Sequence, residues 1–304
     1  MQVVNMKNGK TILDTDGNVL HSHGGCVVKF GDYYYWYGQD NRNHYYVSCY
    51  RSKDCKNWEF RNAVLTADSP TMPSFQSEYK NLRQKLTKKK VNIERPKVIY
   101  CEKTNKYVMW AHYENGRNYK CACACVATCD TPDGDFIYHG AFRPFGNMSR
   151  DCTLYQENQN AYFISASNDN LDLKVYELTD DYLNVSRETC TLFAGKEREA
   201  PTLFKKDGMY YLLTSACTGW TPNQSTYAVS KSIEGPWSDL FEFGDKTTYD
   251  SQPTWVLETN GKFIYVGDRW GGDGKKFLKS TYVFLPIIFN GDKIEINYTE
   301  NYEL

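Results

Sequence analysis

One arrangement of apolar and polar residues recurs along the chain and indicates its architecture. In residues 197–215, Glu199 comes just before Ala200 and Pro201, and a short apolar run is followed by an Asp-Gly turn and a second apolar run rich in Tyr. Pro201 fixes its own φ and favours an extended Ala200. An Asp-Gly pair between two β-prone runs is typical of a hairpin. We therefore predict a strand with a carboxylate at its entrance, followed by a tight hairpin.

Four further units follow the same pattern and determine the predicted fold. A propeller blade of four strands needs roughly 40–50 residues plus loops, and the units begin about 50 to 70 residues apart. We therefore predict an all-β fold in which residues 1–304 form a single five-bladed β-propeller. The predicted blades start near Gly24, Glu94, Asp151, Glu199 and Gln252.

The predicted fold brings these starting residues together. If each unit opens on the innermost strand of its blade, all five starts meet at one end of the central channel. Glu94, Asp151, Glu199 and Gln252 would then share one pocket, although they lie far apart in the sequence. A pocket with several carboxylates indicates acid–base chemistry on a neutral polyol.

One segment between the units breaks the strand pattern. Residues 77–90 predict a short helix, because Tyr79, Leu82 and Leu86 fall on one face at helical spacing. We interpret this segment as an insertion that packs against the blades and carries no chemistry.

Clusters of cysteine and histidine are interpreted as structural. Cys121, Cys123 and Cys125 lie on one side of a strand because side chains alternate, and neighbours about 6.5–7 Å apart are too distant for an unstrained disulfide. We expect small side chains buried between blades, with a metal or redox cluster as the alternative. His21 and His23 fit a hydrogen-bonding or loop role at the channel mouth, and metal ligation is again the alternative.

Composition and charge exclude several classes of function. The formal net charge of −1 gives no electrostatic footprint for nucleic acid or an acidic membrane. Lys88-Lys89-Lys90 is the only basic run and is expected to be a solvated loop. No apolar run reaches the roughly 18 residues of a transmembrane helix, and the eleven cysteines favour reduced thiols. Residues 1–7 lack the apolar core of a signal peptide, so we expect a cytoplasmic protein, or a secreted or periplasmic one whose signal was removed.

Six motifs spread over nearly the whole chain are informative as a set. They are His23-Gly24-Gly25, residues 94–100, Ser149-Arg150-Asp151, Glu199-Ala200-Pro201, residues 218–223 and Gly267-Asp268-Arg269-Trp270. Together with the five-fold repeat of strand–turn–strand units, these motifs resemble glycoside hydrolase family 43. The closer resemblance is to its exo-β-1,3-galactanase branch.

The resemblance implies roles for two of the carboxylates. The family hydrolyses glycosidic bonds with inversion, using a general acid, a general base and a third acidic residue that tunes and orients the acid. Glu199 matches the general acid and Glu94 the tuning residue. A nearby carboxylate raises the pKa of an acid by like-charge repulsion, as an acid working near neutral pH requires. The structural alternative is that Glu94 and Glu199 pair with Arg95 and Arg198.

The predicted base departs from the usual family pattern. Most members carry an Asp where this chain has Gly24, and an inverting enzyme needs a carboxylate across the sugar from the acid, with room for a water. The exo-galactanase branch also lacks that Asp, and Gln252 matches the residue thought to position the water there. Gln252 would orient the water or relay a proton through a rarer tautomer. Asp151 is the other candidate, although a hydrogen bond to sugar hydroxyls suits it better.

Further residues are expected to bind the sugar, because aromatic faces stack on sugar rings and polar tips fix hydroxyls. The predicted substrate-binding residues are Gln39, Tyr119, Asp151, Asn168, Thr218, Trp220, Asp268 and Arg269. A surface loop is the alternative for Gln39, and a structural ion pair at the rim is the alternative for Asp268 and Arg269. We predict no metal site and no cofactor, and a structural cation in the channel stays open.

The function predicted from the sequence is an exo-acting, inverting glycoside hydrolase that releases terminal galactose from β-1,3-galactan or arabinogalactan-type glycans. An α-L-arabinofuranosidase or a β-galactofuranosidase on the same scaffold is the alternative among enzymes. The missing Asp favours a candidate of another class, a non-catalytic carbohydrate-binding propeller. The expected partner is an oligosaccharide or polysaccharide, with no nucleic acid and no membrane, and the sequence leaves the oligomeric state open.

Overall fold

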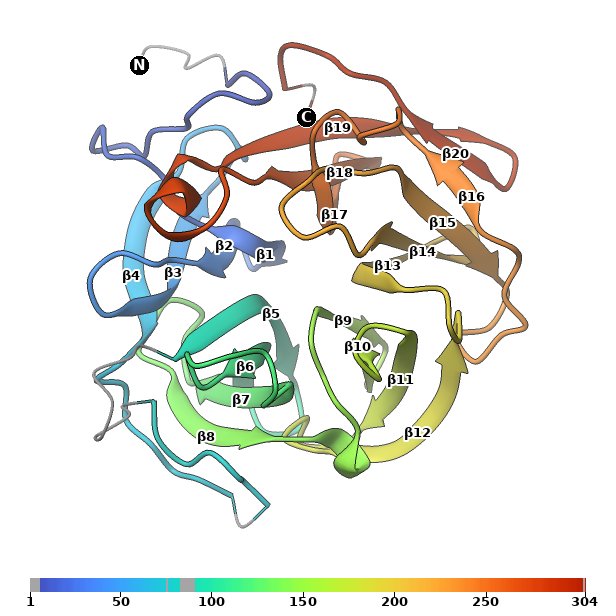
Figure 1. Cartoon of the computed structure of the whole chain (residues 1–304). Helices are drawn as coiled ribbons and strands as arrows, with labels where there is room; N and C mark the ends of the chain where they lie inside the picture. Colours follow the sequence, from blue (N-terminus) through green and yellow to red (C-terminus); the bar gives the residue numbers. More distant parts are fainter. Residues whose placement is uncertain (1–5, 75, 83–90, 303) are drawn as a thin grey trace.

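Five four-stranded antiparallel sheets surround a central channel and form a five-bladed β-propeller (Figure 1). The structure is a computed structural model that describes residues 6–74, 76–82, 91–302 and 304. Each blade takes its four strands in chain order, from the innermost strand to the outermost. The prediction of an all-β propeller with five blades is therefore confirmed.

The strands of each blade follow one another directly along the chain. Blade 1 contains β1 (His23–Phe30), β2 (Tyr33–Gln39), β3 (Tyr45–Ser52) and β4 (Glu59–Thr66). Blade 2 contains β5 (Asn92–Cys101), β6 (Lys106–Glu114), β7 (Cys123–Cys129) and β8 (Ile137–Phe142). Blade 3 contains β9 (Cys152–Glu157), β10 (Asn160–Ser167), β11 (Asp172–Leu178) and β12 (Val185–Leu192). Blade 4 contains β13 (Arg198–Lys206), β14 (Met209–Ala216), β15 (Ser225–Ser230) and β16 (Phe241–Phe243). Blade 5 contains β17 (Gln252–Thr259), β18 (Lys262–Arg269), β19 (Thr281–Asn290) and β20 (Lys293–Ile296).

Two short 3₁₀ helices complete the described elements, η1 (Pro144–Gly146) and η2 (Gly274–Lys279). The first follows blade 2, and the second lies in the connection between β18 and β19. The blade starts predicted from the sequence lie within two residues of the first residue of each inner strand.

The hairpin at the end of β13 is confirmed, but its entrance differs from the prediction. Asp207 and Gly208 both have positive φ, 50° and 81°, as the favoured two-residue hairpin turn requires. The prediction of an extended Ala200 was wrong, because its φ is 53°. The pairing of β13 with β14 slips between Glu199 and Thr202, and this bulge places Ala200 in the left-handed region.

The same slip recurs at the start of four inner strands. The register shifts lie between His23 and Cys26, Glu94 and Lys97, Glu199 and Thr202, and Pro253 and Trp255. A β-bulge bends its strand and re-aims a side chain, and bulges are common beside active sites. In four of the five blades, a β-bulge therefore ends the regular pairing of the inner strand at the channel mouth.

The hydrophobic core is divided into five clusters, each between two neighbouring blades. The cluster between blades 5 and 1 also takes Met6 and Tyr302 from the two ends of the chain. Lys7 and Asn301 form an antiparallel bridge beside it. The ring is thus closed by apolar packing and by contact between the terminal segments.

The predicted helix at residues 77–90 is absent from its described part. Residues 77–82 contain no helix, and Tyr79 forms an isolated bridge with Ala141 instead. Leu82 is buried in the cluster between blades 1 and 2, so the interpretation as a packing segment holds. Leu86 and Lys88-Lys89-Lys90 lie outside the described residues.

The three cysteines of β7 and its approach are buried between blades, as predicted. All eleven are free thiols, and Cys121, Cys123 and Cys125 are buried in the cluster between blades 1 and 2. Among the residues that the structure describes, no helix is long and apolar enough to cross a membrane.

Candidate active site

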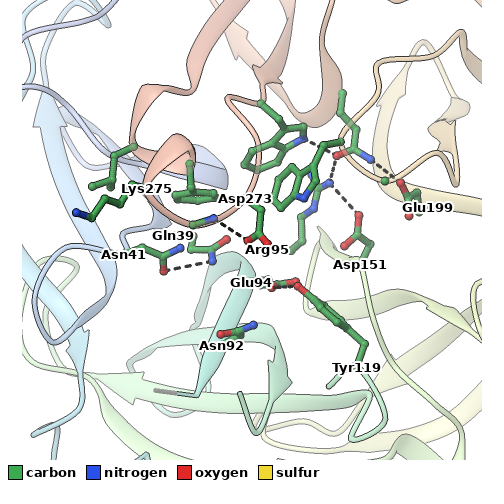
Figure 2. Close-up of a pocket in the computed structure, with 17 residues that line it drawn as sticks. Gln39, Asn41, Asn92, Glu94, Arg95, Tyr119, Asp151, Glu199, Asp273 and Lys275 are labelled. Carbon is green, nitrogen blue, oxygen red and sulfur yellow. Dashed lines mark hydrogen bonds and ion pairs between the residues drawn. The ribbon is translucent and has the colours of Figure 1, made fainter. Parts of the chain in front are cut away.

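A pocket of about 730 Å³ opens at the end of the channel where the inner strands begin. All five blades contribute to its lining, and its volume lies in the range of small-ligand sites. Figure 2 shows Lys275, Asn41 and Gln39 toward one end of the pocket and Glu199 toward the other. The prediction that Glu94, Asp151, Glu199 and Gln252 share one pocket is confirmed.

Two buried cations from β5 occupy the channel beside this pocket. Arg95, only 6% exposed, forms an ion pair with Asp151 at 2.8 Å. Lys97 is 1% exposed and donates to the carbonyl oxygen of Gly24 at 2.7 Å. Burial lowers the pKa of the Lys97 ammonium to about 8, because the charged form loses its hydration.

Arg95 also fills the place where a first-blade carboxylate would project. A Cβ on Gly24 would lie 3.3 Å from Cδ of Arg95 and 3.6 Å from the indole of Trp270. Gly24 has a φ of 61°, which disfavours any residue with a side chain. The chain therefore has both the backbone and the packing of a site built without a carboxylate at this position.

Glu199 is placed to act as an acid. Burial raises the pKa of its carboxyl group, the neighbouring Asp151 raises it further, and Arg95 partly offsets both, so that the pKa is about 7. A carboxyl group with this pKa still holds its proton in about half of the molecules at pH 7, and in most of them below pH 6. Oε1 of Glu199 accepts a hydrogen bond from Nε2 of Gln252 at 2.9 Å, and Asn170 lies 3.4 Å from Oε2.

Asp151 is a neighbouring carboxylate whose charge raises the pKa of Glu199. The tuning and orienting role predicted for Glu94 stays a prediction. The physical reason is proximity through the backbone: Oδ2 of Asp151 accepts the N–H of Ala200, the residue after Glu199, at 3.1 Å. Arg95 pairs with Asp151, and Arg198 donates to Thr side chains, so the predicted structural alternative does not hold.

The side-chain amide of Gln252 has a partner at each hydrogen-bonding position. Its two N–H groups donate to Glu199 and to Oγ of Ser215, each at 2.9 Å. Its carbonyl oxygen accepts from the guanidinium of Arg95 and from Nε1 of Trp270 at 2.7 Å. An amide offers two donors and two acceptor lone pairs, so none is left over for a water in this arrangement.

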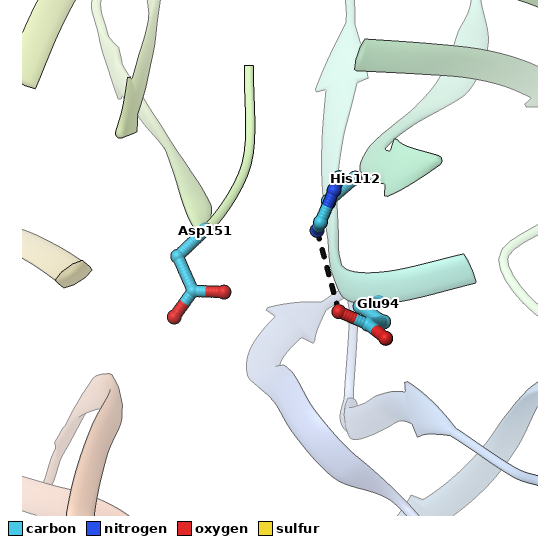
Figure 3. A group of neighbouring side chains, drawn as sticks. All are labelled: Glu94, His112 and Asp151. Carbon is cyan, nitrogen blue, oxygen red and sulfur yellow. Dashed lines mark ion pairs between the residues drawn. The ribbon is translucent and has the colours of Figure 1, made fainter. Parts of the chain in front are cut away.

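Glu94 lies in a different environment. Its Oε1 accepts from the hydroxyl of Tyr119 at 2.7 Å, and its Oε2 lies 3.3 Å from Nδ1 of His112. Figure 3 shows Glu94, His112 and Asp151 as a group, with the ion pair between the first two. On its other side, His112 lies 3.1 Å from the buried carboxylate of Glu114.

Three of the predicted substrate-binding residues line the pocket, in addition to Asp151. Gln39 is buried and lies 3.5 Å from Asn41, so the surface-loop alternative is excluded. Tyr119 and Trp220 are about half exposed, 47% and 46%, which leaves aromatic surface free for a sugar. Trp220 meets the indole of Trp270 edge to face at 5.7 Å.

Two predicted binding residues lie outside the pocket. Asn168 is exposed and donates to Asp172. Thr218 is exposed and donates to the carbonyl of Thr221, which closes its own loop. In their place the structure brings Asn170 to Glu199 and Gly219 to the pocket wall.

Asp268 and Arg269 do not pair with each other, and neither residue lines the main pocket. Asp268 is fully buried and accepts from the backbone N–H of Gly24 at 3.0 Å, with Nδ1 of His23 at 3.5 Å. Arg269 donates to the carbonyl of Tyr249 and faces away from Asp268. Alternating side chains on β18 point to opposite sides, so the two residues diverge. Both line a smaller neighbouring cavity of about 160 Å³.

Sequence reasoning missed several residues of the site. Arg95 and Trp270 stand inside the quoted motifs, but their contacts with Gln252 depend on the arrangement of separate blades. His112 and Glu114 alternate with apolar residues on β6, and this polar pair within an apolar strand was a usable signal. Lys275 comes from the connection that carries η2, for which the repeat gave no expectation.

The comparisons with known proteins agree with this site. The profile of Glycosyl hydrolases family 43 matches residues 23–242. The chain belongs to this family. A curated xylosidase/arabinosidase of Butyrivibrio fibrisolvens is 28% identical over 78 residues, which are 26% of this chain and 14% of that protein.

Solved structures of the family extend the similarity to nearly the whole chain. The crystal structure of an exo-β-1,3-galactanase from Clostridium thermocellum is 46% identical, with a TM-score of 0.86, over 96% of this chain and 65% of that one. An exo-β-1,3-galactanase from Phanerochaete chrysosporium, solved with galactose, is 32% identical with a TM-score of 0.85. This second match covers 98% of this chain and 67% of the other. The family 43 chain described here thus spans about two thirds of the length of these relatives.

Proposed function

We propose that this chain is an exo-acting glycoside hydrolase that removes terminal galactose from β-1,3-linked galactan with inversion. The observation that carries the proposal is Glu199, a buried carboxyl group in a pocket with a pKa of about 7. The substrate rests on similarity to the two galactanases, which extends over at least 96% of this chain.

The proposed reaction uses the acid in one step. Glu199 donates its proton to the glycosidic oxygen while the bond from that oxygen to C1 breaks and a water attacks the opposite face of the sugar. Asp151 keeps the proton on Glu199 before reaction and places negative charge beside the oxocarbenium-like transition state. Gln252 holds Oε1 of the acid through its N–H group.

The shape of the site supports attack on a chain end. Arg95 and Lys97 are buried side chains in the channel next to the pocket, so a glycan strand cannot continue through the propeller. Half-exposed Trp220 and Tyr119 lie at the pocket, where they can stack on sugar rings. A terminal sugar would therefore enter the pocket while the remaining chain stays outside.

Product analysis tests the proposed function. The wild-type protein is incubated with β-1,3-galactobiose and galactotriose, and in parallel with aryl α-L-arabinofuranoside and β-galactofuranoside. We expect galactose as the only monosaccharide released, appearing first as the α-anomer by NMR. Release from a furanoside alone would reject the galactan substrate, and β-galactose as the first product would reject inversion.

The same experiment separates an enzyme from a silent binding propeller. Glu199→Gln keeps the size of the side chain and removes the proton donor. We expect Glu199→Gln to bind galacto-oligosaccharides by calorimetry without releasing galactose. Sugar binding by both proteins with no release by the wild type would reject the enzyme and leave a carbohydrate-binding protein.

A further inference from the structure

The turn between β10 and β11 brings a residue of blade 3 to the carboxyl group of Glu199 in blade 4. Asn168, Asp169 and Asn170 all have positive φ, 50°, 54° and 68°. Residues with a side chain adopt this left-handed conformation mostly one at a time, so three in a row need support from their surroundings. At the end of the turn, the side-chain amide of Asn170 donates to Oε2 of Glu199 at 3.4 Å. Such contacts are often long in a free enzyme and tighten in the complex.

Arg150, which lies just before β9, holds the middle of this turn. Its Nη2 donates to Oδ1 of Asp169 at 2.6 Å and to the carbonyl oxygen of Tyr119 at 3.0 Å. The guanidinium group therefore joins the 168–170 turn of blade 3 to the loop of blade 2 that carries Tyr119. Tyr119 lines the pocket and Asn170 contacts the acid, so Arg150 connects two segments of the site.

The backbone of Arg150 is itself fixed. Its N–H donates to the carbonyl oxygen of Ala166 at 2.8 Å, and the N–H of Ala166 donates to the carbonyl oxygen of Asp151 at 2.8 Å. These two hydrogen bonds continue the pairing of β9 with β10 beyond the last strand residues. The side chain of Arg150 is only 19% exposed. The guanidinium group thus starts from a rigid point and is enclosed along most of its length.

The ion pair of Arg150 with Asp169 matters for geometry more than for stability. The Asp169 side chain is 68% exposed, and ion pairs with an exposed partner add little to the free energy of unfolding. The same pair sits at the centre of a left-handed turn, a conformation that persists only where its surroundings determine it. Loss of the pair should therefore move the turn while the protein stays folded.

The acid is held by two amides from different blades. Nε2 of Gln252, in blade 5, donates to Oε1 of Glu199 at 2.9 Å, and Asn170, in blade 3, contacts Oε2. Because Oε1 already accepts the shorter hydrogen bond, the proton of the neutral acid belongs on Oε2. The direction of Oε2 decides how well the acid protonates a sugar oxygen, since proton transfer needs close alignment of donor and acceptor.

We propose that Arg150 and Asp169 are positioning residues of the acid: their ion pair fixes the 168–170 turn, and Asn170 thereby directs Oε2 of Glu199 toward the glycosidic oxygen. The inference rests on the proposed hydrolase function. A displaced acid protonates a sugar leaving group more slowly, whereas an aryl group that leaves easily departs without the proton. The signature of the proposed role is therefore a loss of activity that depends on the leaving group.

Asp169→Asn tests the ion pair without disturbing the backbone preference, because Asn tolerates the left-handed region as Asp does. A misplacement of 1 Å in an active site can cost about 100-fold. A turn that relaxes in part should lower kcat on β-1,3-galactobiose about tenfold, with KM nearly unchanged. On an aryl β-galactoside with a good leaving group, kcat should stay within about twofold of the wild type. Arg150→Met should show the same pattern, and the midpoint of urea unfolding should change little in either variant.

Arg143→Met is the matched control, because Arg143 holds the same loop as Arg150 does. It donates to the carbonyl oxygens of Lys120 and Cys121 at 2.8 and 3.0 Å. Arg143→Met should keep the wild-type ratio of the two activities. An equal loss on both substrates in Asp169→Asn, or no loss on either, would overturn the inference. A rise in KM alone would also overturn it, because Asp169 would then contact the glycan directly.

A double variant shows whether Asp169 acts through Asn170. Asn170→Gly removes the side-chain amide and keeps a residue that adopts positive φ without strain. If Asp169 acts only through Asn170, adding Asp169→Asn to Asn170→Gly should leave kcat on galactobiose within about twofold of Asn170→Gly alone. Losses that multiply in the double variant would mean that the two residues act separately, and the inference would fail.

Titration of Glu199 by ¹³C NMR tests the contact without substrate. An N–H donor stabilises a carboxylate, so its loss raises the pKa. The midpoint of Glu199, about 7 in the wild type, should rise in both Asn170→Gly and Asp169→Asn. Loss of the negative charge of Asp169 would by itself lower the midpoint, so the direction of the shift identifies the route. The other titratable or charged groups that face Glu199 are the same in all of these proteins: Asp151, Arg95 and Cys217.

An unchanged or lower midpoint of Glu199 in Asp169→Asn would overturn the action through Asn170. Because this titration needs no turnover, its failure is distinct from failure of the proposed function, in which the wild type itself releases no galactose.

Discussion

Glu94 and Glu199 occupy equivalent places in the repeat, each two residues before a proline, yet their surroundings are opposite. Glu94 follows the start of β5 and Glu199 the start of β13, and a register slip lies next to each. Glu199 is buried beside the carboxylate of Asp151. Glu94 faces the hydroxyl of Tyr119 and the imidazole of His112, whose pKa is raised to about 9 by its carboxylate neighbours Glu114 and Glu94.

This comparison separates what the fold decides from what the neighbours decide. The propeller brings both carboxyl groups to one pocket, because each stands at the entrance of an inner strand. The charge that faces each group comes from another segment: Asp151, before β9, faces Glu199, and His112, on β6, faces Glu94. The same repeat position can therefore place a carboxyl group beside a like charge in one blade and beside a histidine in another.

The largest effect is expected when Glu199, the proposed general acid, is replaced. Glu199→Gln should lower kcat on galactobiose by about 10³-fold, because general acid catalysis typically contributes 10²- to 10⁴-fold. The loss should shrink on an aryl galactoside with a good leaving group, which departs without protonation. Steady-state kinetics on both substrates measures the effect.

Glu242→Gln is the control for this prediction, because Glu242 is an exposed residue of β16 outside the pocket. It should retain wild-type kinetics on both substrates. An equal loss on both substrates for Glu199→Gln would mean that the residue does not act as a proton donor.

The second effect concerns the stability that His112 gains from its carboxylate neighbours Glu94 and Glu114. The folded pKa of His112, about 9, lies above the ordinary 6.5, so its stabilising contribution is complete below pH 6.5 and is lost as pH rises to 9. The free energy of unfolding of the wild type should exceed that of Glu114→Gln by on the order of 2–3 kcal/mol near pH 6. The difference should narrow toward pH 9.

Urea unfolding at several pH values between 6 and 9 measures this difference. Comparing two proteins that differ at Glu114 alone cancels the other groups that titrate in this range. A difference that stays constant with pH would show that His112 carries no charge in the folded protein.

The third effect is expected when the negative charge of Asp151, which lies beside Glu199, is removed. In Asp151→Asn the like charge beside Glu199 is lost, ionisation becomes easier, and the pKa of Glu199 falls. The alkaline limb of kcat/KM, expected near pH 7 in the wild type, should move to lower pH by about one unit. Asn keeps an oxygen for Arg95 and for the N–H of Ala200, so the backbone contact survives.

The pH dependence of kcat/KM on galactobiose provides the measurement. If the alkaline limb of kcat/KM does not move in Asp151→Asn, another residue raises the pKa of Glu199. Glu94→Gln is then the variant to compare. A limb shifted by Glu94→Gln alone would confirm the tuning role that the resemblance implies for Glu94.

The smallest expected effect lies at the pocket mouth, outside both carboxyl environments. Trp220→Ala removes a half-exposed indole and should raise KM about three- to tenfold with little change in kcat. Phe145→Ala is the control, because Phe145 is exposed but lies outside the pocket. A fall in kcat without a change in KM would mean that Trp220 acts on the reaction itself.

The fold was accessible from the sequence because each blade repeats its own signals. The Asp207-Gly208 turn has the two positive φ values of its hairpin type, and the blade starts fall at the predicted positions. The bulges could not be predicted from the sequence, because they arise where the inner strand leaves its partner strand at the channel mouth. Ala200 shows this directly, since its left-handed φ overrides the extended preference before Pro201.

The sequence was sufficient to predict several residues of the site, but not the electrostatic interactions between them. The repeat places Glu94, Asp151 and Glu199 in one pocket, but sequence spacing does not reveal which carboxylate approaches which. The N–H of Ala200 on Asp151 and the imidazole beside Glu94 are contacts between blades or between adjacent strands. Asn168 was chosen in place of Asn170 for a related reason: a turn of consecutive polar residues does not reveal which one points inward.

Direct titration of Glu199 tests the central claim that its surroundings make it the acid. The protein is labelled with ¹³C at glutamate side-chain carboxyl groups, and the signal of Glu199 is assigned by its absence from Glu199→Gln. We expect a titration midpoint of about pH 7 for this signal. A midpoint near the ordinary 4.5 would contradict the account, because Glu199 would then hold no proton at neutral pH.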